Sequence, residues 1–107
     1  MKEVHIFAQG AWHEEAYIVG EKESLKLLRD TLTRAIDAED GMSSQELSTN
    51  DGEGYDVHVV SLSKEAMNKM GLPYTAEVAL DERETATWPW MFYKDLKAKR
   101  EKEGFKR

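Results

Sequence analysis

The chain has 107 residues, a formal net charge of −6 and no cysteine. This length is typical of one domain, and the lack of cysteine excludes disulfides, cysteine-based zinc sites and iron–sulfur centres. The charge is uneven, because residues 1–93 hold 8 Lys/Arg and 18 Asp/Glu whereas residues 94–107 hold 7 Lys/Arg and 3 Asp/Glu. The acidic body is expected to repel phosphate groups, which argues against broad binding to duplex nucleic acid.

The first ten residues, MKEVHIFAQG, contain a short apolar run interrupted by His5, so we expect no signal peptide. No stretch approaches the ~20 consecutive apolar residues of a membrane helix. We therefore expect a cytoplasmic protein that does not bind membranes. A domain of this size buries about 60–65% of the surface of its unfolded chain, so a ligand would occupy a surface groove or a site between subunits.

Residues 3–9 and 11–19 are rich in β-branched and aromatic side chains with weak alternation. This pattern predicts a β-hairpin that turns near Gly10. A helix over residues 11–19 is the alternative, since Ala and Glu favour helices. The candidate site residues on this segment are Trp12, His13 and Tyr17.

The spacing of apolar residues predicts a helix over residues 24–39. Ser24 is a suitable N-cap and Gly41 a suitable C-terminal stop. The apolar stripe expected to face the core consists of Leu25, Leu28, Leu32, Ala35 and Ile36.

Residues 43–49 and 55–62 are predicted to be the strands of a second hairpin, joined by the motif NDGEG. Asp-Gly between two strands is a strong turn signal. A calcium loop needs alternating acids, whereas Asn50 and Asp51 are adjacent and no acid occupies the required twelfth position. A phosphate loop needs a glycine-rich turn that leads into Lys-Ser/Thr and a helix, and this one leads into a strand. A hairpin whose backbone amides also contact a ligand is the second interpretation.

Three helices are predicted after the second hairpin. Ser63 would cap the first, KEAMNKM, which Gly71 ends. Thr75 would cap the second, AEVALDERE. The last would start at TWPWMFY, with Pro89 tolerated in its first turn, and would end near Gly104.

The element order ββ-α-ββ followed by helices predicts the α+β class. We expect one domain over residues 1–107, with a core in 1–86 and an aromatic-basic C-terminal helix in 87–107. The core would be a four-stranded, mainly antiparallel sheet packed by one long helix.

Catalytic and metal motifs are weak. WHEEAY lacks the second histidine of HExxH, because Tyr17 occupies its place. A zinc site would need His5, His13 and His58 to converge. His13 and Glu15 would point the same way on a strand, which suits a general base, but no nucleophile signature accompanies them. We therefore expect no enzyme activity and no cofactor.

Two groups of residues are candidates for binding. Aromatic side chains with polar tips suit a groove for a planar ligand, and the dense aromatic start of the last helix suits an oligomer interface. The ligand-binding candidates are Trp12, His13, Tyr17, Asp51, Gly52, Gly54, Tyr55 and Tyr74. The interface candidates are Trp88, Trp90, Phe92 and Tyr93.

The motifs QGAWHEEAYIVG and DGEGYDVHVV, with the helix between them, resemble those of small bacterial and phage proteins over residues 3–80. Small, acidic, cysteine-free proteins of this kind include phage anti-defence proteins. Some of these are "sponges", non-enzymatic oligomers that sequester nucleotide second messengers. The resemblance implies a homo-oligomer with a nucleotide-type ligand, and it assigns no role to any single residue.

The sequence thus predicts a non-enzymatic binding protein that sequesters a small, planar, polar ligand of nucleotide or cyclic-nucleotide type. The alternative is a protein–protein interaction module, such as an inhibitor or immunity-type protein, that acts through an acidic face.

Overall fold

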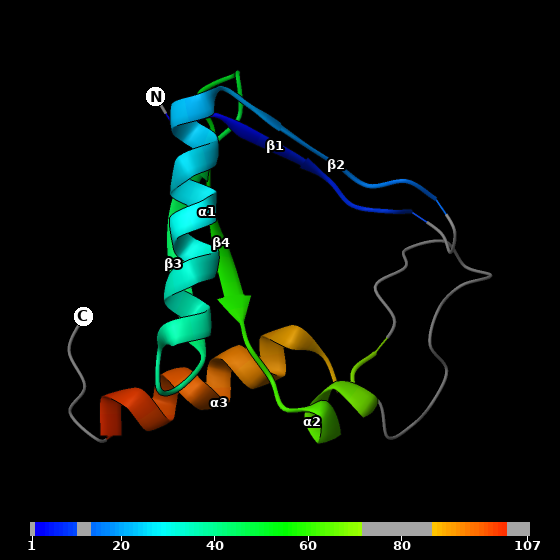
Figure 1. Cartoon of the computed structure of the whole chain (residues 1–107), viewed down its shortest axis with the longest axis vertical. Helices are drawn as coiled ribbons and strands as arrows, with labels where there is room; N and C mark the ends of the chain where they lie inside the picture. The colour runs from blue at the N-terminus through cyan, green and yellow to red at the C-terminus, as the bar shows by residue number, and fades with distance from the viewer. Residues whose placement is uncertain (1, 11–13, 72–86, 103–107) are drawn as a thin grey trace.

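The computed structural model describes residues 2–10, 14–71 and 87–102 (Figure 1). The short helix predicted over 76–84 and the helix end predicted near Gly104 lie outside these residues. The elements in chain order are β1 (Val4–Phe7), β2 (Tyr17–Gly20), α1 (Lys22–Asp37), β3 (Met42–Ser48), β4 (Gly54–Val60), α2 (Lys64–Asn68) and α3 (Pro89–Lys102).

The body of the protein is α1 packed on the β3–β4 hairpin. β3 and β4 are antiparallel in the register Met42↔Val60 to Ser48↔Gly54, so the predicted second hairpin is confirmed. The core consists of Val4, Leu28 and Leu47, with Tyr55 and Val57 packed against it. Alternation along β4 therefore directs Tyr55 and Val57 toward the helix, as their spacing predicts.

α1 begins two residues before the predicted start. Glu21 is the N-cap and makes no side-chain capping bond, so the prediction of Ser24 as the cap is wrong; Ser24 is buried in the first turn instead. α1 ends at Asp37 with Ala38 as its C-cap, three residues before the predicted stop at Gly41. Gly41 has φ +70° and closes the turn that leads into β3. Its amide donates to the Ala38 carbonyl at 3.0 Å.

The buried face of α1 differs from the predicted apolar stripe. Leu28 and Ala35 are buried, but Leu32 and Ile36 are 46% and 73% exposed. The small side chain of Thr31 is fully buried, and the Ser43 hydroxyl donates to the Thr31 carbonyl at 2.5 Å. Small side chains allow the helix backbone to approach the strand, which rotates the larger apolar residues toward solvent.

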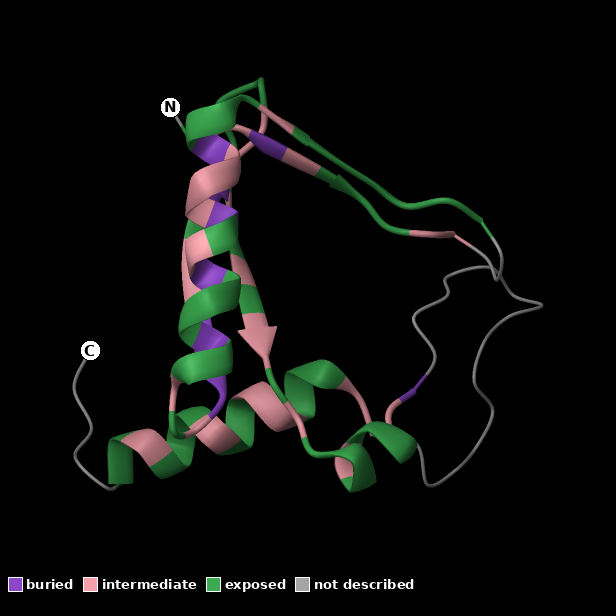
Figure 2. Ribbon diagram, in the orientation of Figure 1, coloured by how far each residue is buried: buried purple, intermediate pink, exposed green. Residues whose placement is uncertain are grey.

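The pairing of these two segments as an antiparallel hairpin is confirmed, and the alternative of a helix is wrong for Tyr17–Gly20, which is strand. The predicted turn near Gly10 is wrong, because the strands end at Phe7 and Tyr17 and residues 8–16 connect them. β1 and β2 pair antiparallel from Val4↔Gly20 to Phe7↔Tyr17. This hairpin leaves the body as a projecting arm, most of which is exposed (Figures 1 and 2).

The prediction of one four-stranded sheet is wrong, because the described part of the chain forms two separate two-stranded sheets. A parallel bridge, Glu3↔Ser48, links them, and in it the Ser48 amide donates to the Lys2 carbonyl at 2.9 Å. In a continued parallel ladder the next acceptor after Lys2 would be the Val4 carbonyl. This carbonyl accepts from the Tyr55 hydroxyl at 2.5 Å. A side chain therefore replaces the backbone donor that a continued ladder would need.

α3 crosses the end of the body and contacts β4, and α2 lies beside the start of α3 (Figure 1). The Ser63 hydroxyl accepts from the Ala66 amide at 3.1 Å, which confirms the predicted cap of α2. α3 starts at Pro89, as its sequence predicts. Arg100 fixes the far end of α3 through two hydrogen bonds to the Asp40 carboxylate, each 2.6 Å. None of the helices within the described ranges combines the length and apolar character needed to span a bilayer.

Candidate functional site

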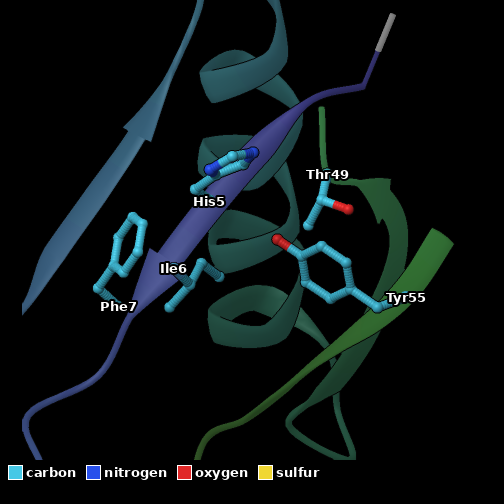
Figure 3. A pocket seen from close by; sticks show the side chains of 5 residues that line it. All are labelled: His5, Ile6, Phe7, Thr49 and Tyr55. Atoms are coloured by element: carbon cyan, nitrogen blue, oxygen red, sulfur yellow. The ribbon is translucent and has the colours of Figure 1, made fainter. Parts of the chain in front are cut away.

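A pocket of about 310 Å³, which we call the β1 pocket, lies where β1 passes the β3–β4 turn (Figure 3). Its lining comes from β1, from the turn and from the start of β4. The residues are His5, Ile6, Phe7, Thr49 and Tyr55.

Tyr55 connects the two parts of the pocket. Its side chain points from β4 toward β1 (Figure 3), and its hydroxyl donates to the Val4 carbonyl at 2.5 Å. The hydroxyl is therefore used in holding the arm, and the ring supplies an apolar wall. The predicted ligand residue Tyr55 thus has both a structural contact and a place in the pocket.

The turn between β3 and β4 is closed by its own hydrogen bonds. The Thr49 amide donates to the Glu53 carbonyl at 2.9 Å, and the Gly52 amide donates to the Thr49 carbonyl at 3.0 Å. Gly52 has φ +86°, a conformation that glycine adopts without a steric cost. Gly54 has no positive φ and is simply the first residue of β4.

The Asp51 carboxylate organises this turn. It accepts from the Thr49 hydroxyl and, at 3.1 Å, from the Glu53 amide. The Thr49 hydroxyl and then the Glu53 amide lower the pKa of Asp51 below its usual range. The negative charge is thus stabilised at neutral pH by the loop that it closes.

The backbone amides of the turn have little capacity for a phosphate. Those of Gly52 and Glu53 donate within the turn, and that of Asn50 donates to His5 Nε2 at 3.1 Å. The prediction that amides around Gly52 and Gly54 cradle an anion therefore gains no support from the geometry. The turn instead supplies the pocket with Thr49.

His5 is oriented by its bond to the turn. Because Nε2 accepts the Asn50 amide hydrogen, a neutral imidazole must carry its own hydrogen on Nδ1. Its ring is tilted by 59° to Phe7, with the centroids 6.0 Å apart. The wall formed by these two residues thus combines aromatic surface with one hydrogen-bond donor.

Of the four remaining predicted ligand residues, the structure describes Tyr17. Tyr17 lies opposite Phe7 on the arm, and its hydroxyl donates to the Glu15 carboxylate, which raises the pKa of Tyr17. Trp12, His13 and Tyr74 lie outside the described residues.

Sequence reasoning missed His5, Ile6, Phe7 and Thr49 as pocket residues. Alternation along residues 3–9 places His5 and Phe7 on one face of a strand, and this was the available signal. Thr49 precedes an Asp-Gly turn and had no comparable marker.

The predicted interface residues on α3 have different environments. Tyr93 stacks on His58 with centroids 3.9 Å apart, so it docks α3 on β4. Trp88 and Trp90 stack on each other at 5.5 Å, and Trp90 is largely exposed. Phe92 is half-buried and lines a second pocket.

This second pocket, of about 340 Å³, lies between β4, α2 and the start of α3. Its lining is mainly apolar, with Val60, Met67, Met70 and Phe92 among its residues. Such a surface offers packing and few groups that would fix the orientation of a polar ligand.

The described histidines do not form a metal site. His5 contacts the turn, whereas Nδ1 of His58 is 2.7 Å from the Ser44 hydroxyl. Within the described ranges, no group of three or more potential ligands is arranged to hold a metal ion.

The geometry defines an α+β protein with an arm and a small aromatic pocket at its base. Comparison of the chain with protein-family models, curated proteins and solved structures finds no match.

Proposed function

We propose that the protein is a non-catalytic binding protein that sequesters a small planar ligand with a nucleobase, such as a nucleotide or cyclic nucleotide. The observation that supports this most is the lining of the β1 pocket, which combines Phe7 and Tyr55 rings with the polar groups of His5 and Thr49. Aromatic faces stack on a base with little regard to its identity, and a few polar groups then orient it.

The size of the pocket favours recognition of the base over that of the whole nucleotide. A volume of about 310 Å³ is at the lower end of small-molecule sites, which start at roughly 300 Å³. A base and part of a sugar would fill it, and phosphates would extend into solvent. His5 Nδ1–H would meet an acceptor on the base edge, and the Thr49 hydroxyl oxygen, whose hydrogen is donated to Asp51, would accept from a base amino group.

The charge around the pocket also favours a ligand whose base lies inside the pocket and whose phosphates lie in solvent. Asp51 lies beside Thr49 and stays ionised at neutral pH, because its pKa is lowered. An anionic phosphate would be repelled by this carboxylate. Salt screens such repulsion, so a nucleotide should bind more tightly as ionic strength rises, whereas a nucleoside should be nearly indifferent to salt.

Isothermal titration calorimetry with nucleosides, nucleotides and cyclic dinucleotides tests this proposal. Phe7→Leu should weaken binding by roughly tenfold, since base–aromatic stacking contributes about 1–3 kcal/mol. Phe92→Leu is the matched control, because it makes the same change in the other pocket. Binding of no compound to folded protein, or equal losses in both variants, would overturn the proposal.

A protein-binding module is the second candidate function, and one feature of the sheet favours it. Glu46 and Asp56 are directly opposite each other on β3 and β4, and both are exposed. Like charges in this position destabilise a hairpin, and Lys2 reaches only Glu46, at 3.6 Å. A basic surface on a partner would relieve this repulsion.

The variant Asp56→Lys distinguishes ligand binding from partner binding as the function of the protein. It should stabilise the isolated protein while abolishing capture of a basic partner. It should leave calorimetric binding of a nucleoside unchanged, because Asp56 does not line the β1 pocket.

A further inference from the structure

Two stacked indole rings lie at the start of α3. The ring planes of Trp88 and Trp90 are 4° apart, and their centroids are separated by 5.5 Å. Trp88 precedes Pro89, the first residue of the helix, so its ring can meet a side chain two positions away, which helical spacing would prevent. Trp90 is 66% exposed, so the stack ends in an indole that is open to solvent.

Hydrogen bonds fix the backbone that carries Trp88. The amide of the preceding residue, Thr87, donates to the Lys69 carbonyl at 2.7 Å, and the Thr87 hydroxyl donates to the same carbonyl at 3.0 Å. The Gly71 amide donates in return to the Thr87 carbonyl. The start of α3 is therefore tied to the chain that follows α2.

Gly71 also supports the Trp88 ring. A Cβ at Gly71 would lie 2.6 Å from both Cε3 and Cη2 of Trp88, and closer still to Cζ3 between them. Such close contact with three successive ring atoms places the glycine over the face of the indole, because an approach to the edge would bring it this close to one atom only. Trp88 is therefore packed on both Gly71 and Trp90. The outer ring, that of Trp90, is thus held in place before any ligand stacks on it.

Lysine side chains continue this surface along α3. Lys94 and Lys97 follow Trp90 by four and seven residues, which places them within about 40° of it around the helix, at roughly 100° per residue. Both lysines are exposed. Glu101 is next in the same row and ends the positive charge. The row from Trp90 to Lys97 is about 10 Å long, at 1.5 Å per residue.

The charge of α3 is opposite to that of the rest of the chain. Residues 94–102 hold 5 Lys/Arg and 2 Asp/Glu, whereas residues 1–93 hold 8 Lys/Arg and 18 Asp/Glu. An anionic partner is therefore attracted to α3 and repelled by the body, which directs it to this one surface.

We propose that Trp90, Lys94 and Lys97 form a docking surface for a short stretch of single-stranded nucleic acid. An unpaired base stacks on the open indole, and the two lysines contact the phosphates that follow this base. At roughly 3.4 Å per nucleotide, a row of about 10 Å covers about three nucleotides. A duplex keeps its bases paired and stacked, so it cannot offer a base to the indole.

Other anionic partners fit this surface less well. A membrane surface needs a continuous apolar face on the helix, but beyond Trp90 and Met91 the exposed positions of α3 hold Lys94, Asp95 and Lys97. An acidic peptide could pair with the lysines, but only a nucleic acid carries a planar ring and an anion in every unit. The proposal is independent of the ligand proposed for the β1 pocket, because none of its residues lines that pocket.

Fluorescence anisotropy of the full chain with a labelled oligothymidine of about 12 nucleotides tests the proposal. Trp90→Ala should weaken binding by roughly tenfold and leave its salt dependence unchanged, because it removes stacking only. The double variant Lys94→Gln/Lys97→Gln should instead lower the slope of log K against log salt by about 1.4, at roughly 0.7 per phosphate contact. All three side chains are exposed, so circular dichroism should show folded proteins.

Two control variants and two other probes complete the test. Lys99→Gln makes the same change at an exposed position on the opposite side of α3 and should leave the slope nearly unchanged. Phe7→Leu should leave the affinity for the oligonucleotide unchanged; a loss there and none with Trp90→Ala would show that the strand enters the β1 pocket, and would overturn the proposal. The absence of binding at low salt, equal binding of a duplex, or binding of anionic lipid vesicles in place of the oligonucleotide would also overturn it.

Discussion

Arg100 should contribute more to stability than an ordinary surface ion pair. Its guanidinium donates twice to the Asp40 carboxylate, at 2.6 Å each, and once to the Met42 carbonyl at 3.1 Å. The two side chains are only 15% and 22% exposed. Exposed pairs contribute about 0.2–1 kcal/mol, whereas hydrogen bonds to charged groups contribute about 1.5–3 kcal/mol. We therefore expect a coupling energy of about 2 kcal/mol between these residues.

A double-mutant cycle in urea measures this coupling. Arg100→Ala, Asp40→Ala and the double variant are compared by their free energies of unfolding. Arg100→Ala alone should lower the melting temperature by about 10 °C, since 1 kcal/mol corresponds to roughly 4–8 °C in a domain near this size. Lys99→Ala, at an exposed neighbour on α3, is the control. A coupling energy below about 0.5 kcal/mol would refute the reasoning.

Two further predictions concern the loops. Hydrogen bonds from Thr49 and Glu53 lower the folded-state pKa of Asp51, so their stabilisation of the turn is fully present above the unfolded value of about 3.9 and is lost as pH falls through the folded pKa. An NMR titration should show the Glu53 amide shifting below about pH 4, and Asp51→Asn should remove that shift; an amide that titrates equally in both proteins would contradict the assignment. Gly41→Ala should cost about 2–4 kcal/mol in thermal unfolding, because φ is +70° and the added Cβ would lie 2.6 Å from a carbonyl oxygen. Gly54→Ala, whose Cβ would meet no atom closer than 3.7 Å, should be nearly neutral, and equal losses at both glycines would show that backbone conformation is not the cause.

The elements that the sequence predicts well are those set by local chemistry. The β3–β4 hairpin follows from alternation and an Asp-Gly turn, and α2 follows from the Ser63 cap. Pro89 marks the start of α3 because its ring suits a first helical turn. Each of these signals depends on residues within a few positions of one another.

The relation between the two sheets was beyond sequence reasoning. Whether the Val4 carbonyl pairs with a backbone amide or with the Tyr55 hydroxyl depends on two residues 51 positions apart. Likewise, Thr31 is polar by type, and only its packing against β3 shows that it is buried ahead of Leu32. Tertiary contacts decide such choices, and hydropathy patterns do not record them.

The candidate site was predictable only in part. Tyr55 and the turn beside it were identified, but their partner wall on β1 was not. The prediction relied on glycine amides, whereas the turn uses those amides to close itself around Asp51. A carboxylate that accepts hydrogen bonds within its own loop, as Asp51 does, has the same sequence pattern as a carboxylate that binds a ligand.

The separation of the arm from the body has a consequence for how the chain folds. α1, β3 and β4 form one continuous stretch, residues 22–60, and pack mainly on one another. Both hairpins are local in sequence and lose little loop entropy, but α1 covers β3 and β4, whereas β1 and β2 leave most of their apolar side chains exposed and a lone two-stranded hairpin is marginal in water. This stretch should therefore fold first and offer the Tyr55 hydroxyl as an anchor for Val4. The arm would become ordered afterwards, and an amide-exchange pulse during refolding should protect β4 before β1.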